Sequence, residues 1–268
     1  MMKLTASKSQ AVCAQKVAKR AMLACAVFAL LGASAGCATK SAFDHLSSDE
    51  KAANFNAELG TNYLATGELE NAEVKLERAL AQDPGNALAN NSYAKLRATL
   101  EDPQGADSAF IKSIRLDPKR AEYRNNYAIF LCGQGRVAEA ISQFEAASRN
   151  KFYRTPEFAL DNAGVCAMDH SQFELADKHL RDAIRLNPAF APSMLHMAEL
   201  KLKTGDAAVA DAYHARFLTL SRHTPRSLAV GIDIKRYVGD QATAQEYAEQ
   251  LVANYPRSSQ ARTFLASN

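Results

Sequence analysis

The sequence predicts an all-α fold, a right-handed superhelical solenoid of helix–turn–helix repeats. The 268-residue chain is 47% hydrophobic but has only 12 Gly and 8 Pro, so it can form a core yet lacks the turn residues of an all-β fold. Its body is rich in Ala and Leu, which favour helices. The strongest observation is an internal period of about 34 residues, which is typical of stacked helical repeats.

Residues 1–36 have the layout of a secretory signal peptide. Five basic residues and no acidic one occupy the first twenty positions, and residues 21–36 carry no charge. This apolar stretch is shorter than the roughly 20 residues that a helix needs to cross a bilayer. Its removal takes away five of the 32 basic side chains and none of the 29 acidic ones, which leaves a net charge of about −2. We therefore expect no nucleic-acid partner, because such binding depends on basic side chains.

Cys37 follows small residues at the end of this apolar stretch, an arrangement that resembles the lipobox of bacterial lipoproteins. The resemblance implies that Cys37 is diacylated and becomes the new N-terminus. Ala38 rather than Asp comes next, which by resemblance to sorted lipoproteins favours the outer membrane. An ordinary cleavage site just before an incidental Cys37 is the alternative. Residues 37–52 then form the lipidated cysteine and a polar tether.

One repeat register runs from residue 53 to residue 258. The first unit carries Leu59-Gly60, Tyr63, Gly67, Ala72 and Pro84 at spacings that resemble those of tetratricopeptide repeats. The predicted units are residues 53–86, 87–120, 121–154, 157–190, 191–224 and 225–258. Residues 259–268 remain as a C-terminal tail. The last two units fit the pattern less well, as terminal repeats often do.

Small residues recur where the two helices of a unit would cross. They form the column Ala72, Ala106, Ala140, Ala176, Ala210 and Ala244. A larger side chain there would push the helices apart. A glycine in the turn, such as Gly67, is expected to supply a positive φ at the end of the first helix.

Cys132 and Cys166 are the cysteines that remain after the signal peptide and Cys37. They lie one repeat apart, allowing for the inserted residues 155–156, on the first helices of the third and fourth units. Neighbouring helices pack about 8–10 Å apart, so inward-leaning thiols could reach the separation of a disulfide. An even pair in an oxidising compartment favours that bond. The alternative is two buried free thiols that act as small hydrophobes.

The sequence contains no motif of a catalytic or cofactor site. Phosphate-binding glycine loops, dinucleotide fingerprints and paired-histidine zinc motifs are all missing. The six histidines are scattered, and each is expected on the surface or in a groove rather than as a metal ligand. We therefore expect no enzyme activity, no cofactor, no metal and no small-molecule substrate.

The register predicts which residues of the first helices face a partner-binding groove. These residues are Asn91, Lys95, Asn125, Asn126, Ile129, Asp161, Asn162 and Val165. Asn amides both donate and accept, so a row of them can hydrogen-bond an extended peptide backbone. The alternative is that these Asn side chains cap or bridge neighbouring helices.

Four segments together resemble the PilF/PilW family of type IV pilus assembly lipoproteins. They are Asn125-Asn126-Tyr127-Ala128-Ile129-Phe130-Leu131-Cys132, Gly135-Arg136, Tyr153-Arg154-Thr155-Pro156 and Asn162-Ala163-Gly164-Val165-Cys166. The resemblance covers about residues 37–258.

This resemblance implies an outer-membrane pilotin. Such a protein binds pilus secretin subunits, sits on the periplasmic face of the outer membrane through its lipid in the inner leaflet, and promotes secretin multimerisation. It also implies that the two cysteines pair. The alternative function is a periplasmic scaffold for another envelope or cell-wall complex. No set of residues in the sequence supports a role as an enzyme accessory protein.

Overall fold

The computed structural model describes residues 46–267, and within that range it contains thirteen α-helices and no strand. The predicted all-α repeat solenoid is therefore correct. Of the described residues, 48–267 form one compact unit. The predicted signal peptide and the lipidation site Cys37 lie outside the described residues.

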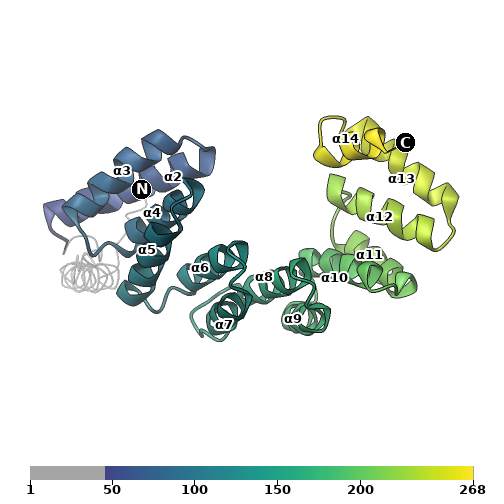
Figure 1. Ribbon diagram of the computed structural model, residues 1–268, viewed down its shortest axis with the longest axis horizontal. Helices are drawn as coiled ribbons and strands as arrows, with labels where there is room; N and C mark the ends of the chain where they lie inside the picture. Colours follow the sequence, from purple (N-terminus) through teal and green to yellow (C-terminus); the bar gives the residue numbers. More distant parts are fainter. Residues whose placement is uncertain (1–45, 268) are drawn as a thin grey trace, which may run out of the picture. The chain divides into compact units, whose positions relative to one another are not determined.

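The helices follow one another in pairs (Figure 1). The pairs are α2 (Ser48–Thr66) with α3 (Leu69–Gln82), α4 (Ala87–Thr99) with α5 (Pro103–Leu116), α6 (Ala121–Gly133) with α7 (Val137–Ser148), α8 (Pro156–Asp169) with α9 (Phe173–Leu186), α10 (Ala191–Lys203) with α11 (Ala207–Leu220), and α12 (Pro225–Tyr237) with α13 (Gln241–Asn254). A last helix, α14, spans Ser259–Ala266. Each of the six predicted repeat ranges thus corresponds to one helix pair, although α2 begins before residue 53 and α8 begins one residue before its range, at Pro156.

The first helices of the pairs form one continuous layer. Each of α2, α4, α6, α8 and α10 contacts the first helix of the following pair, and also packs against its own partner. Among the described residues, no two second helices make comparable contact with each other. The surface of the solenoid that runs unbroken from repeat to repeat is therefore built from first helices.

The small-residue column is buried as its predicted role requires. All of its alanines but the last are fully inaccessible to solvent, and Ala244 is only 3% exposed. Around them, the largest buried cluster extends from Ala94 on α4 to Leu200 on α10. A core that passes from unit to unit explains why no pair needs to fold alone.

Each turn between paired helices contains one residue in the left-handed backbone conformation, with a positive φ. Gly67 has φ +80°, and the turn glycines of three other units have similar values. The second and fourth units have no glycine at this place, and Glu101 (φ 58°) and Ser171 (φ 59°) adopt the left-handed conformation instead. The turn geometry is thus conserved between units even where the sequence does not favour it.

The two ends of the solenoid differ from the predicted ranges. Helix α2 begins at Ser48, inside the range 37–52 that was assigned to the tether. The predicted tail contains α14, which packs on α12 and α13 and buries Ala261 completely. Ser258 caps α14 by accepting a hydrogen bond from the Ala261 N–H. A short helix therefore covers the apolar end of the last unit. In the part of the chain that the structure describes, no helix is long and apolar enough to span a bilayer.

Candidate functional site

Cys132 and Cys166 meet between neighbouring first helices. Cys132 lies near the end of α6 and Cys166 near the end of α8, and their sulfur atoms are joined at 2.06 Å. Their Cα atoms are 5.9 Å apart, within the range of about 4.4–6.8 Å that a disulfide needs. The expected pairing is thus compatible with the packing of the two helices. It closes a loop with a sequence separation of 34.

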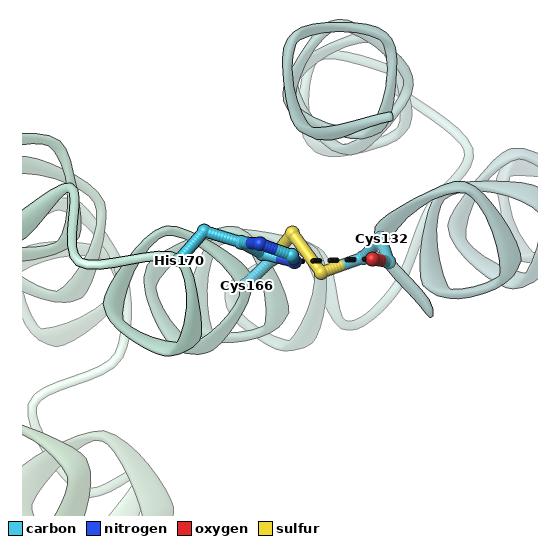
Figure 2. The surroundings of a disulfide bond; sticks show 3 residues. All are labelled: Cys132, Cys166 and His170. Carbon is cyan, nitrogen blue, oxygen red and sulfur yellow. Dashed lines mark hydrogen bonds between the residues drawn. A yellow bond between two sulfur atoms is a disulfide. The ribbon is translucent and has the colours of Figure 1, made fainter. Parts of the chain in front are cut away.

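His170 lies beside these sulfur atoms. It follows the last residue of α8, and its ring points toward Cys132 (Figure 2). The ring Nε2 lies 3.1 Å from the backbone carbonyl oxygen of Cys132. Because a carbonyl oxygen only accepts, Nε2 is the donor in this bond. The imidazole therefore links the same two first helices that the cysteines join.

A pocket of about 400 Å³ opens next to the disulfide. Its walls come from α6, α7, α8 and the residue after α8. The lining residues are Ile129, Cys132, Gly133, Phe144, Asn162, Val165, Cys166, Asp169 and His170. Ile129, Asn162 and Val165 are among the predicted groove residues, and the Ile129 side chain is 50% exposed. The pocket thus offers an apolar floor with one amide and two titratable side chains near it.

The predicted asparagines form bonds between neighbouring first helices. The Asn126 amide donates to Oδ1 of Asn91 at 2.9 Å, and the Asn162 amide donates to Oδ1 of Asn125 at 3.0 Å. These bonds join α6 to α4 and α8 to α6, which agrees with the alternative of bridging side chains. An Asn side chain has two N–H donors and one acceptor oxygen, so a single bond does not use all of its capacity. Asn125, Asn126 and Asn162 also remain partly exposed.

Asn91 and Asp161 do not face a partner surface. Asn91 is only 3% exposed and also lies within hydrogen-bond distance of Ser113. Asp161 is 4% exposed and accepts from the Ser193 hydroxyl at 2.7 Å and from His196 Nδ1 at 2.9 Å. Their register points them into the contact between neighbouring first helices, so neither side chain is accessible to a partner.

Lys95 also lies apart from the pocket lining. Its side chain is exposed on α4, and it is not among the residues that form the walls of the pocket. The predicted groove set therefore divides into the pocket residues, the bridging amides, two buried residues and one exposed lysine.

His179 was expected on the surface or in the groove, and the structure contradicts this. Its side chain is fully buried on α9, at a second pocket of about 460 Å³ that Glu145 and Lys178 also line. Neither ring nitrogen has a hydrogen-bond partner among the described residues, and Nε2 lies 3.8 Å from the Glu145 carboxylate. Burial lowers the pKa of His179, and the nearby Lys178 adds to this, whereas Glu145 opposes it.

Acid should weaken the fold through its buried histidines. Burial also lowers the pKa of His214, which is 1% exposed. Below the unfolded pKa of 6.5 the unfolded chain takes up protons that the native protein does not, so stability falls as pH falls. Between pH 7.5 and 5.5 we expect a loss of up to about 1.4 kcal/mol in the free energy of unfolding for each such histidine. Urea unfolding at the two pH values measures it.

The variant His179→Gln tests the assignment of this effect. Glutamine does not titrate, so the loss between pH 7.5 and 5.5 should be smaller in the variant than in the wild type. An equal loss in both proteins would show that His179 plays no part in the acid sensitivity.

Comparison with known proteins gives relatives that match this architecture. The tetratricopeptide repeat family model matches residues 94–151, a range that includes α6 and α7. The chain is 30% identical over 243 residues to the type IV pilus assembly protein PilF of Pseudomonas aeruginosa, a match that covers 90% of this chain and 96% of that protein.

Two solved structures are similar along most of their length. One is the crystal structure of PilW, described as a widely conserved type IV pilus biogenesis factor, with 31% identity and a TM-score of 0.68. That similarity covers 80% of this chain and 98% of PilW. The other is Pseudomonas aeruginosa pilF, with 30% identity and a TM-score of 0.66, over 83% of this chain and 100% of that one.

Proposed function

Since the chain belongs to the PilF/PilW family of tetratricopeptide proteins, we propose that it supports type IV pilus biogenesis as a non-enzymatic scaffold. More specifically, it acts as a pilotin: it binds subunits of the pilus secretin and promotes their delivery to the outer membrane and their multimerisation. The observation that carries this proposal is the match to PilF, which covers 96% of that pilus assembly protein.

The secretin subunit binds along the layer of first helices. The pocket beside the disulfide receives an apolar side chain of the partner, because Ile129 and Val165 present apolar surface there. Its volume of about 400 Å³ falls within the range of about 300–1,000 Å³ found for ligand pockets. The amides of Asn125, Asn126 and Asn162 lie on the same helices and supply hydrogen bonds to the backbone of the partner segment.

The lipid on Cys37 places the scaffold at the periplasmic face of the outer membrane. Stable anchoring needs about two acyl chains, and a diacylated cysteine provides them. The residues between Cys37 and α2 tether the solenoid to the bilayer. Binding of the partner by an anchored scaffold then concentrates secretin subunits at the membrane where they assemble.

Ile129→Asp should weaken secretin binding at least 10-fold. A carboxylate in the pocket has to lose its hydration when an apolar partner side chain enters, which opposes binding. The affinity of the purified mature protein for the periplasmic part of the secretin, measured by calorimetry, tests this expectation.

Ile111→Asp is a matched control. Ile111 lies on the second helix α5 and is 48% exposed, close to the 50% of Ile129. The same substitution at nearly the same exposure should leave secretin affinity unchanged. If the two variants bind equally well, the pocket is not the binding surface.

Cys37→Ala should release the protein from the membrane fraction. Alanine cannot be acylated, so the variant keeps its fold but has no lipid anchor. Fractionation of cell envelopes, with immunoblotting of each fraction, measures the change. Unchanged recovery with the outer membrane would exclude Cys37 as the anchor.

A further inference from the structure

Three side chains of metal-binding types converge at one edge of the pocket. One ligand atom each from Cys132, Cys166 and His170 can be chosen so that all three lie within 4.8 Å of one another. Cys166 and His170 are four residues apart, one helical turn, which brings their side chains to the same face at the end of α8. Cys132 joins them from the neighbouring first helix (Figure 2).

These residues form a suitable ligand set only when the two cysteines are reduced. Thiolates are the metal-binding form of cysteine, and a disulfide sulfur is a poor ligand in comparison. Two thiolates and one imidazole are the ligand types that Zn²⁺ prefers, with three protein ligands and a water in tetrahedral geometry. We propose that reduction of the disulfide converts this edge of the pocket into a Zn²⁺ site with Cys132, Cys166 and His170 as ligands.

The geometry allows this conversion. With Zn–S bonds of about 2.3 Å, two thiolates of a tetrahedral site lie about 3.8 Å apart. Cα atoms at 5.9 Å leave room for that spacing through rotation of the cysteine side chains, without separating α6 from α8. His170 has to give up its bond to the Cys132 carbonyl, and because its side chain is exposed it can turn freely. The open pocket provides the path by which the ion enters.

The conversion takes two steps, reduction of the disulfide and then binding of Zn²⁺, and atoms and electrons balance in both. A dithiol reductant exchanges with the disulfide, so its own two thiols become a disulfide while Cys132 and Cys166 each gain a hydrogen. Binding of Zn²⁺ then replaces the two thiol protons, which go to solvent, with two Zn–S bonds. The metal holds α6 to α8 when the covalent bond is absent, and it blocks the thiols from oxidation until it leaves.

Zinc titration of the reduced mature protein tests the proposal. The protein is reduced, freed of reductant without oxygen, and titrated with Zn²⁺ against a chromophoric chelator. We expect one Zn²⁺ per chain for the reduced wild type and at least 10-fold weaker binding for His170→Ala. The oxidised wild type is the matched control, since it keeps every residue but has no thiolate at Cys132 or Cys166, and it should not bind at this site.

A second measurement separates binding from any loss of fold. Zinc should raise the thermal midpoint of the reduced wild type, followed by far-UV circular dichroism, and at the same zinc concentration it should raise that of reduced His170→Ala by less. The proposal is wrong if the reduced wild type binds no stoichiometric zinc, if His170→Ala binds as tightly, or if the oxidised protein binds equally well.

Discussion

Replacing Cys132 and Cys166 together by Ala is expected to lower the free energy of unfolding by about 3.8 kcal/mol. The bond restricts the unfolded chain by closing a loop with a sequence separation of 34, and the chain-entropy model gives this value for that loop. The bond also joins the third and fourth units, whose interface lies within the largest buried cluster. Urea unfolding of the mature protein, followed by far-UV circular dichroism, measures the difference.

Chemical reduction of the wild type serves as the control for this double variant. In the presence of a chelator, the reduced wild type should unfold at nearly the same urea concentration as the double variant. If the oxidised wild type and the double variant differ by less than about 1 kcal/mol, the two residues act mainly as small hydrophobes.

Gly164→Ala is expected to destabilise the fold by about 2–3 kcal/mol. A β-carbon built on Gly164 would lie 2.6 Å from Cγ and 2.8 Å from Cδ2 of Leu180, and 3.3 Å from the Ala176 carbonyl oxygen. Leu180 is fully buried, so α8 and α9 have to move apart to make room. The shift of the urea midpoint, at unchanged dependence on urea concentration, measures this effect.

Gly133→Ala is the matched control in the neighbouring unit. Gly133 ends α6, and a β-carbon there would meet nothing within 4 Å. Alanine favours the helix over glycine, so this variant should be more stable than the wild type by about 0.5–1 kcal/mol. Destabilisation of both variants by a similar amount would mean that the close approach of α8 and α9 is not what requires a glycine at 164.

Local sequence signals predicted most of the fold. The alanine column and the turn glycines act within one helix pair, so the same residues reappear at each unit and can be read from the period. Glu101 and Ser171 could not be predicted in the same way. They adopt a positive φ because their units repeat the turn of the others, not because their side chains favour it.

The site was less predictable because it depends on contacts between units. The register placed Asn91 and Asp161 on the inner side of their helices. It did not show whether a neighbouring helix or a partner lies there. A modest rotation of a helix decides between these outcomes. Burial of His179 depends in the same way on the packing of α9 against α8.

The three proposed metal ligands were also hard to predict, because they too depend on a contact between units. The spacing of Cys166 and His170 is visible in the sequence, yet two ligands on one turn are a weak signal. The third ligand, Cys132, comes from the preceding unit, and only the stacking of α6 on α8 brings it within reach. Cys166 and His170 could have been found from the sequence by examining spacings between cysteines and histidines, and not only spacings between histidines.

Secretin assembly in a deletion strain tests the central claim most directly. We expect a strain without this protein to lose secretin multimers from the outer membrane and to lose twitching motility. The wild-type gene and Ile111→Asp should restore both, whereas Ile129→Asp should not. Normal secretin rings and normal twitching in the deletion strain would contradict the account, and would point instead to a scaffold for another envelope complex.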